Sequence, residues 1–371
     1  MRIFQEAGCS NLGLPPDSYI YAFGTTHFPS HDAPGQVSAV ISSDDSLRLF
    51  DNATLEPLPD GIFHSVNRGV TSLATHFSSS TSPYLTAGRD GFVRGWDLRA
   101  RGKVLELATP KGESLSALAS NPDIHAVVAG MELESNGPGD VSIFGWDVRF
   151  PEKIKLHYAE SHTDTVTELR FLPRDGRPSN FLLSGSTDGL VNIYDTSITE
   201  EEDAVFQVIN HRSAIHHAGL LGNNIYALGT DETLSFYSQQ NPDLETQDPY
   251  PVHLGDVREQ FGCDYIVDVV QIGSTPLVSA GRHTDDPHLD LIPLAKGPVP
   301  SPGWIPELNH RIRLAGGHGP EIIRDVLWYT DDEVIFTCGE DGMVRVWKER
   351  NGPPADVEMI EPTSKEKTRQ R

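Results

Sequence analysis

The sequence has few of the residues that mark disulfide-rich, zinc-binding or membrane proteins. Its three cysteines, Cys9, Cys263 and Cys338, are far apart and form no CxxC pair, so neither a disulfide framework nor a zinc site is indicated. No apolar run reaches the roughly 18 residues of a membrane-spanning helix, and the opening MRIFQEAGCS lacks the basic and apolar parts of a signal peptide. We expect a soluble protein of a reducing compartment, in the cytoplasm, the nucleus or both.

Positive charge is also scarce. The chain has 29 Lys and Arg against 53 Asp and Glu, a formal net charge of −24. Because phosphates are repelled by such a surface, a general binder of nucleic acids or anionic membranes is disfavoured. The excess would attract a basic partner, although an acidic surface also simply keeps a protein soluble. The acidic residues gather at 200–203, 243–248, 285–290 and 331–333.

The composition favours an all-β protein. The chain has 33 Gly, 27 Pro and 37% hydrophobic residues, which suits many short strands joined by turns better than a helical bundle. Its 371 residues are enough for two ordinary domains or for one large closed β architecture.

One 11-residue string recurs along the chain with its key positions in register. Its fourth residue is always Asp, its seventh is aliphatic and its tenth is aromatic. The six copies are ISSDDSLRLFD from residue 41, AGRDGFVRGWD from 87, GPGDVSIFGWD from 137, GSTDGLVNIYD from 185, LGTDETLSFYS from 228 and CGEDGMVRVWK from 338. The Asp suits a tight turn, where its carboxylate accepts backbone N–H bonds, and the alternation that follows predicts a half-buried strand.

The spacing of the copies reveals a seventh, degenerate unit. Successive copies start 46, 50, 48, 43 and then 110 residues apart, so the last gap is about twice the period. Residues 264–294 fill it with two predicted strands, YIVDVVQIG and TPLVSAG, but His283 stands where the Asp is expected. We therefore predict a single seven-bladed β-propeller with a degenerate sixth blade.

A ring of sheets needs a closing strand, because otherwise sheet edges stay exposed. We predict that the segment from Arg2 to Glu6 supplies the outer strand of the last blade. The propeller then spans residues 1–350, and residues 351–371, which lack apolar periodicity, form a disordered charged tail.

The strings resemble the WD-repeat superfamily over nearly the whole chain. In that pattern a His, a strand Ser or Thr, the turn Asp and the Trp form a hydrogen-bonded set that locks one blade, and this resemblance implies a structural role for them. The last unit has the full set, and the fourth has a partial one because Tyr194 replaces the Trp. The residues are His318, Thr337, Asp341 and Trp347 in the last unit, and His162, Ser184 and Asp188 in the fourth.

A narrower likeness, to one group within the superfamily, rests on the fourth and last strings together with motifs near them. These are EEEDA at 200–204 after the fourth string, DVRE at 256–259 and GGHGPEIIR at 316–324. The likeness implies the fold and little about function.

No common catalytic signature is present. GxSxG, HExxH, GxxxxGK and GxGxxG are all missing, so we expect a protein that is not an enzyme and has no cofactor. Some WD-repeat propellers are esterases, but nothing here selects a nucleophile. The cluster HTDDPHLD at 283–290 offers metal-ligand types, yet Pro287 and its like-charged neighbours favour a solvated hairpin loop, and we predict no metal. The cluster contains His283, Asp285, Asp286, His288 and Asp290.

The resemblance also implies that partner peptides bind over the mouth of the central channel. Cationic residues outnumber the acids Asp268 and Glu340 at the corresponding positions, so the mouth is expected to attract a carboxylate or phosphate. The alternative is that these arginines pair with nearby acids. The predicted mouth residues are Arg89, Arg282, Arg324, His216, Thr167, Thr187, Glu340 and Asp268.

Two further strings bear on partners. WDLR at 96–99 and WDVR at 146–149 resemble the WDxR box by which substrate receptors dock an adaptor of cullin-based ubiquitin ligases, through Arg99 and Arg149. Both arginines would otherwise cap strand ends. We expect a monomeric, non-catalytic scaffold for other proteins or peptides. The alternatives are a ligase substrate receptor and a chaperone-like binder of a basic client such as a ribosomal protein or histone.

Overall fold

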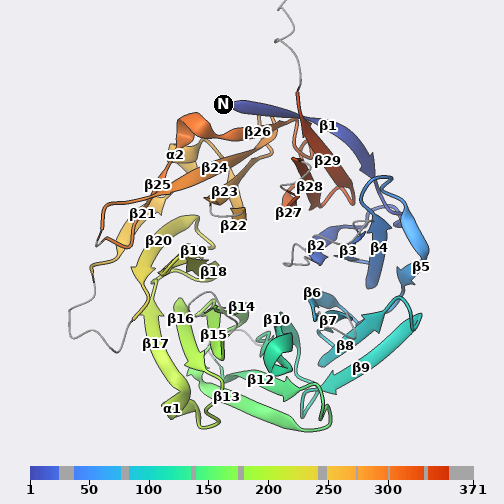
Figure 1. The fold of residues 1–371 in the computed structure, drawn as a ribbon, viewed down its shortest axis with the longest axis vertical. Helices are drawn as coiled ribbons and strands as arrows, with labels where there is room; N and C mark the ends of the chain where they lie inside the picture. The colour runs from blue at the N-terminus through green and yellow to red at the C-terminus, as the bar shows by residue number, and fades with distance from the viewer. Residues whose placement is uncertain are drawn as a thin grey trace, which may run out of the picture.

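The computed structural model describes residues 1–24, 37–76, 83–134, 139–173, 179–240, 249–272, 275–299, 301–329 and 333–350, so the predicted tail at 351–371 lies outside it. The described residues form short β-strands grouped around a central axis (Figure 1). Helical elements are single turns: η1 (Pro122–Ile124), α1 (Glu201–Ala204), α2 (Arg258–Phe261) and η2 (Leu308–His310). In the described part of the chain, no helix is long and apolar enough to cross a membrane. The all-β prediction is confirmed.

Five of the sheets contain four strands each, which lie in chain order. We call each sheet a blade and number the blades along the chain. Blade 1 is β2 (Ile20–Gly24), β3 (Val37–Ser42), β4 (Ser46–Asp51) and β5 (Pro57–Phe63); blade 2 is β6 (Val70–Thr75), β7 (Tyr84–Gly88), β8 (Phe92–Asp97) and β9 (Gly102–Ala108); blade 3 is β10 (Leu115–Asn121), β11 (Ala126–Met131), β12 (Val141–Asp147) and β13 (Ile154–His162); blade 4 is β14 (Val166–Phe171), β15 (Phe181–Ser186), β16 (Leu190–Asp195) and β17 (Val205–Asn210); blade 5 is β18 (Ile215–Leu221), β19 (Asn224–Gly229), β20 (Thr233–Ser238) and β21 (Val252–Asp256).

The remaining strands form one nine-stranded sheet, in which two further units of four are joined. These units bring the described total to seven. Blade 6 is β22 (Tyr265–Ile272), β23 (Thr275–Arg282), β24 (His288–Lys296) and β26 (Ile312–Ala315), with β25 (Trp304–Pro306) paired to the end of β24; blade 7 is β27 (Ile323–Tyr329), β28 (Val334–Gly339), β29 (Val344–Glu349) and β1 (Arg2–Ser10). The degenerate repeat at 264–294 corresponds to β22, β23 and β24.

The first strand of the chain joins the two ends of the ring. β1 pairs antiparallel with β29 from Phe4 to Ser10, while its first residues also pair parallel with Ile312–Leu314 of β26. In Figure 1 it lies along the outside of β29 and reaches β26. Arg2 adds an ion pair of 2.7 Å with Glu349. β1 therefore covers the edges of two blades, and the parallel pairing with β26 was not foreseen.

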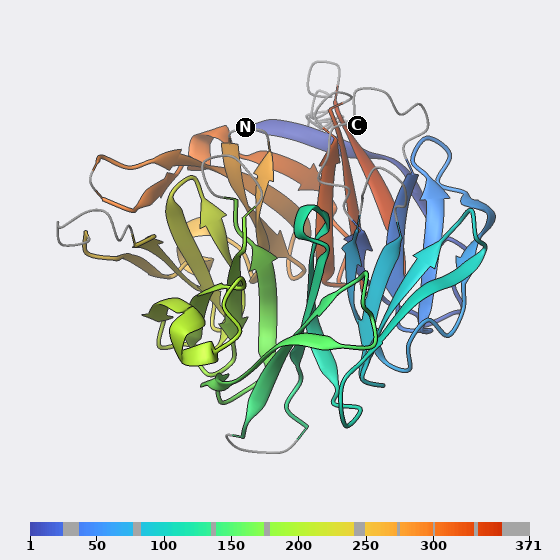
Figure 2. The same cartoon turned by 60° about the horizontal axis from the view of Figure 1, so that its bottom comes forward.

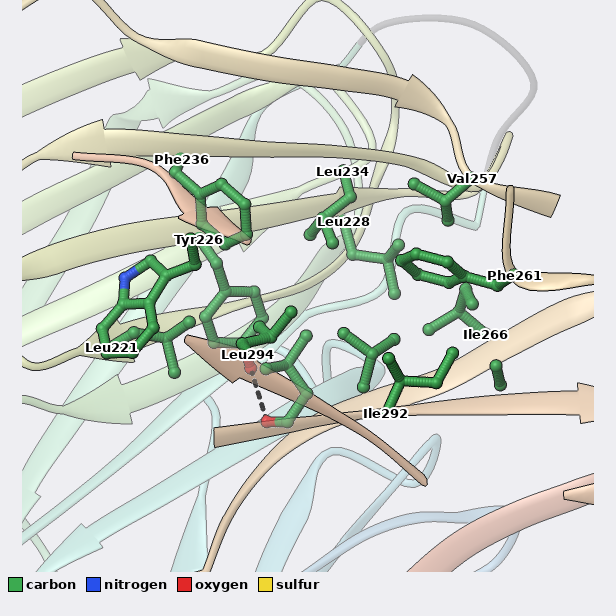
Figure 3. Packing of buried hydrophobic residues seen from close by; sticks show 14 of the residues in the cluster. Leu221, Tyr226, Leu228, Leu234, Phe236, Val257, Phe261, Ile266, Ile292 and Leu294 are labelled. Carbon is green, nitrogen blue, oxygen red and sulfur yellow. Dashed lines mark hydrogen bonds between the residues drawn. The ribbon is translucent and has the colours of Figure 1, made fainter. Parts of the chain in front are cut away.

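The hydrophobic core consists of seven separate clusters, each between two neighbouring blades. Between blades 5 and 6, for example, Tyr226 and Phe236 pack against Phe261, Ile292 and Trp304 (Figure 3 labels most of this cluster). Since each sheet buries apolar side chains on both faces, no blade has a solvated face. This explains why apolar and polar residues alternate only weakly along the strands of the repeated strings, and why these strands are mostly buried.

The first strand of each blade lies nearest the axis, and the turns gather on the two faces of the ring (Figures 1 and 2). All seven inner strands contain a register shift near their start, which leaves one residue out of the ladder. These bulge residues are Tyr21, Thr71, Ser116, Thr167, His216, Val267 and Arg324.

The packing of β1 predicts a large effect of one substitution. Phe4 is fully buried against Leu314 and Trp347, so Phe4→Ala is expected to lower the free energy of unfolding by about 3 to 5 kcal/mol. Denaturant unfolding measures this. The control is Ile3→Ala at a partly exposed position on the same strand, where less than about 1 kcal/mol is expected. Equal effects of both substitutions would show that β1 does not seal the ring.

Candidate functional site

The predicted set of blade 7 is assembled as one buried chain of hydrogen bonds. His318 contacts Asp341 through Nδ1 at 2.8 Å and Thr337 through Nε2 at 2.7 Å, and the indole N–H of Trp347 donates to Thr337 at 2.8 Å. His318, Thr337 and Trp347 are each at most 3% exposed. The set ties the loop before β27 to β28 and β29.

Blade 4 holds the partial set. His162 contacts Asp188 at 2.9 Å and Ser184 at 2.6 Å, which are the distances of a catalytic triad. In place of a Trp, the amide of Asn192 donates to the hydroxyl of Tyr194 at 3.2 Å. Ser184 is fully buried and His162 is 2% exposed, so a substrate cannot reach the serine.

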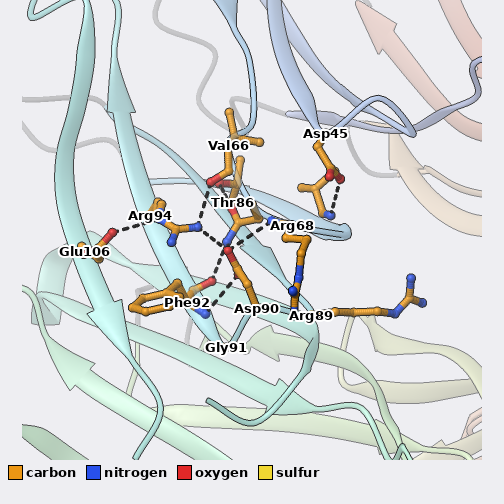
Figure 4. Close-up of polar contacts among 12 residues, drawn as sticks. Asp45, Val66, Arg68, Thr86, Arg89, Asp90, Gly91, Phe92, Arg94 and Glu106 are labelled. Carbon is orange, nitrogen blue, oxygen red and sulfur yellow. Dashed lines mark hydrogen bonds and ion pairs between the residues drawn. The ribbon is translucent and has the colours of Figure 1, made fainter.

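Blade 2 carries a set that the sequence did not reveal. Asn67 takes the place of the His, donating to Asp90 at 2.9 Å and accepting from Thr86 at 2.6 Å, while Trp96 donates to Thr86 at 3.0 Å (Figure 4 shows Asp90 and Thr86). The signal was present, because AGRDGFVRGWD has both the Asp and the Trp.

A second missed feature is an arginine at the eighth position of three strings. Each guanidinium pairs with the turn Asp four residues earlier. The strand that follows the turn therefore also contacts the Asp carboxylate. The pairs are Arg48–Asp44 at 2.9 Å, Arg94–Asp90 at 2.6 Å (Figure 4) and Arg345–Asp341 at 2.8 Å. Arg48 is 2% exposed and also donates to the carbonyl of Leu12 at 2.9 Å.

At the mouth, two of the three predicted arginines already have acidic partners within the chain. Arg89 binds Glu132 at 2.5 and 2.9 Å, and Arg324 is hydrogen-bonded to Glu340. The buried Nε of Arg282 has no hydrogen-bond partner among the described residues. The arginines therefore match the alternative of internal pairing better than a free anion site.

The other mouth residues contribute little charge or free hydrogen bonding. Burial, followed by the neighbouring His217, lowers the pKa of His216 to about 4, so this ring is neutral at pH 7. The hydroxyl of Thr167 donates to the carbonyl of Ile215 in the next blade at 2.8 Å. Thr187 contacts the carbonyl of Thr165 at 3.4 Å.

Asp268 does not have the register of the other predicted mouth residues on inner strands. Val267 is the bulge residue of β22, and Asp268 lies one position further along the strand. Because the sixth repeat is degenerate, its register cannot be read from the string pattern.

Asp268 belongs to a polar network that joins the inner strands of blades 4 to 6 and the second strand of blade 5. Arg170 bridges Glu168 and Asp268 at 3.0 Å each, His217 contacts Glu168 at 2.9 Å, and the hydroxyl of Tyr226 donates to Asp268 at 3.1 Å. Burial would raise the pKa of the Glu168 carboxyl, but the charges of Arg170 and His217 outweigh it and lower that pKa. The network ties three blades together near the axis.

Asp325, on the inner strand of blade 7, has no ion pair among the described residues. Its carboxylate accepts the N–H of Phe23 from blade 1 and that of Val326, both at 2.7 Å. Burial raises its pKa to about 6 despite these two hydrogen bonds. Asp325 joins the last blade to the first.

The cluster at 283–290 is divided between an exposed turn and a buried strand. Asp285 and Asp286 are exposed, whereas His288 and Asp290 lie buried on β24, so the prediction of a solvated loop is wrong for these two. Asp290 is bound by Arg313 at 2.8 Å and by Arg311 at 3.0 Å. His283 lies 3.4 Å from Asp264. Within the described ranges, no three His, Cys, Asp or Glu residues are placed to hold a metal ion.

Two surface grooves are lined in part by cationic side chains. The first, of about 460 Å³, lies between blades 1 and 2, where Arg94 and Lys103 both bind Glu106 and only Arg68 has no ion pair among the described residues (Figure 4). The second, of about 760 Å³, lies between the β12–β13 turn and Thr199. It contains Arg149, which binds Asp147 at 2.6 and 2.9 Å.

The two WDxR arginines occupy equivalent turns of blades 2 and 3. The Arg99 side chain is 74% exposed and lies 3.8 Å from Asp97, and the Arg149 side chain is 56% exposed. Both are accessible to a partner.

Comparison with known proteins identifies the repeats. The model of the WD domain, G-beta repeat, matches residues 61–97, 154–195 and 310–348. The chain contains WD40 repeats. WD40 propellers typically serve as protein-interaction scaffolds.

Several curated WD-repeat proteins are similar to this one. An uncharacterized WD repeat-containing protein of Saccharomyces cerevisiae is 33% identical over 70% of this chain and 63% of its own length, so the chain spans less than two thirds of that relative. One of Schizosaccharomyces pombe is 26% identical over 71% of this chain and 78% of its own length. The WD repeat-containing protein 89 homolog of Dictyostelium discoideum is 24% identical over 83% of this chain and 79% of its own length. This last protein represents the narrower group to which the motifs pointed.

The lock of blade 7 predicts a destabilised WD-repeat protein when its His is removed. His318→Ala removes one hydrogen-bond partner from Asp341 and one from the buried Thr337 and leaves a cavity, so the free energy of unfolding is expected to fall by about 2 to 4 kcal/mol. His310→Ala, at an exposed side chain, is the matched control with an expected loss under about 0.5 kcal/mol. Denaturant titration of both variants decides, and an unaffected His318→Ala protein would argue against the lock.

Asp325 predicts a pH-dependent contribution to stability. Its pKa is about 6 in the fold against an ordinary 3.8, so the folded state binds the proton more tightly. Its contribution therefore favours folding below about pH 4 and is lost as the pH rises through 6. Relative to Asp325→Asn, the wild type should lose about 2 to 3 kcal/mol between pH 4 and pH 7. A difference between the two proteins that stays constant over this range, measured by denaturant unfolding, would contradict the assignment.

Proposed function

We propose that this WD-repeat protein is a non-catalytic scaffold that holds partner proteins on the faces of its propeller. The observation that carries the proposal is the burial of the Ser–His–Asp set in blade 4. Ser184, His162 and Asp188 have triad distances, but the serine is fully buried and serves the packing of blade 4. A nucleophile must be reached by its substrate, so this set supports structure and not catalysis.

The surface supports the binding part of the proposal. The polar groups of the hydrogen-bonded sets are paired with one another inside the blades. The turns, in contrast, present the exposed Arg99 and Arg149 and a groove of about 760 Å³. A propeller keeps such turns at fixed separations because each blade is packed on both sides. Fixed, exposed turns on a rigid ring suit the simultaneous binding of partner segments.

A ligase substrate receptor is a second candidate, favoured by one observation. Arg99 and Arg149 lie in equivalent turns of neighbouring blades and are both exposed, as docking of an adaptor requires. The other alternative, a chaperone-like protein that binds a basic client, is supported by the net charge of −24. Its acidic clusters are partly used within the fold: Glu201 accepts backbone N–H bonds from residues 159 and 160, and Glu333 pairs with Arg2. The cluster at 243–248 lies outside the described residues.

Affinity purification of the full-length protein tests the scaffold role. We expect partner proteins to remain bound at about 50 mM salt and, for a basic client alone, to dissociate at about 300 mM because the attraction is then screened. Arg149→Ala should release a ligase adaptor while Arg89→Ala/Arg324→Ala retains it. A protein that has no stoichiometric partner at either salt concentration, yet hydrolyses a p-nitrophenyl ester with loss in Ser184→Ala, would overturn the proposal.

A further inference from the structure

The groove beside the β12–β13 turn, which we call the Phe150 groove, has an unusual combination of side chains. Its lining comprises Asp147, Arg149, Phe150, Pro151, Glu152, Lys153, Ile154, Lys155 and Thr199. Phe150 is 65% exposed and is the one Phe with an exposed side chain among the described residues. A volume of about 760 Å³ is within the range of ligand-binding pockets and is large enough for a few side chains.

The turn holds Phe150 in place. The N–H of Phe150 donates to the carbonyl of Asp147 at 2.8 Å, and the N–H of Lys153 donates to the carbonyl of Phe150 at 3.1 Å. The Asp147 carboxylate binds both the backbone N–H and the guanidinium of Arg149. Hydrogen bonds from Arg149 lower the pKa of Asp147 to about 2, so the pair persists over the whole physiological pH range. An exposed ring on an ordered turn loses little entropy on binding.

The charge around Phe150 is opposite to that of the protein as a whole. Lys153 and Lys155 are exposed and have no ion pair among the described residues, and the Arg149 guanidinium lies 5.9 Å from the Phe150 ring. Asp147 is neutralised by Arg149, which leaves Glu152 as the one unpaired acid in the lining. On a chain of net charge −24, this groove is a cationic site with an aromatic centre.

The preceding blade shows that this combination is not a requirement of the turn. The WDLR turn of blade 2 has the same Trp-Asp-x-Arg frame, but Ala100 stands where blade 3 has Phe150. Its second arginine, Arg101, lies 3.4 Å from Asp60 of blade 1. The phenyl ring and the two free lysines are therefore additions to a turn that folds without them.

Resting on the proposed scaffold function, we infer that the Phe150 groove binds an acidic segment of a partner protein that carries one large apolar side chain. The apolar side chain packs on Phe150, and the carboxylates face Lys153 and Lys155. A short segment fits better than an extended phosphate chain, because exposed Glu200, beside Thr199, and Glu202 repel a long polyanion. The electrostatic match also steers an acidic partner to this one site on an acidic protein.

Photo-cross-linking of the full-length protein in cells tests the inference. p-Benzoylphenylalanine replaces Phe150, and cross-linked segments are identified by mass spectrometry. We expect segments with more Asp and Glu than Lys and Arg, and a yield at least about fivefold lower in Lys153→Glu/Lys155→Glu. The matched control is Lys111→Glu/Lys348→Glu, which makes the same change in net charge at two exposed positions outside the groove and should leave the yield within about twofold. The same cross-linker at Ala100 gives the background.

Several results would overturn the inference. They are cross-linked segments with net positive charge, adducts of nucleic acid or lipid, a yield that both charge reversals reduce equally, and no adduct above the Ala100 background. Co-purification separates these failures from failure of the scaffold role. If partners co-purify equally with the wild type and with Phe150→Ala, the scaffold function stands and the groove assignment is wrong.

Discussion

Every sheet of this protein has two apolar faces and an edge, and none of them can stay exposed to water. The ring meets this constraint because each pair of neighbouring blades encloses one of seven apolar clusters. The last sheet is completed by the first strand of the chain, which covers β29 and also pairs with β26. The fold therefore depends on a contact between residues more than 300 positions apart in sequence.

The polar groups inside the blades follow from the same constraint. A buried carboxylate or imidazole needs a partner, and each set supplies one: His318 with Asp341, His162 with Asp188, and Asn67 with Asp90. Nearer the axis, Arg170 and Asp325 do the same between blades. Groups that resemble catalytic residues are thus occupied in holding strands and loops together. Recognition is left to side chains on the turns, where Phe150 replaces the Ala100 of the neighbouring blade.

The repeat string made most of the architecture predictable. An Asp in a turn and an aromatic residue at a fixed distance encode a hairpin locally, so the blades and the set around His318 could be found from the sequence. Features that depend on a distant partner could not. Arg48, Arg94 and Arg345 were visible as residues, but their pairing with the turn Asp requires the hairpin geometry. The sequence predicts a loop at Asp290 because the partners that bury it, Arg311 and Arg313, lie beyond the extra strand β25.

Closure of the ring by β1 is tested most directly by hydrogen exchange of the full chain and of a variant that lacks residues 2–10. If one strand seals the ring, its loss should accelerate exchange in blades 6, 7 and 1, whose shared clusters lose their cover, while blades 3 and 4 change least. Acceleration confined to β29, with blades 6 and 1 unchanged, would contradict closure as the constraint on which the fold depends.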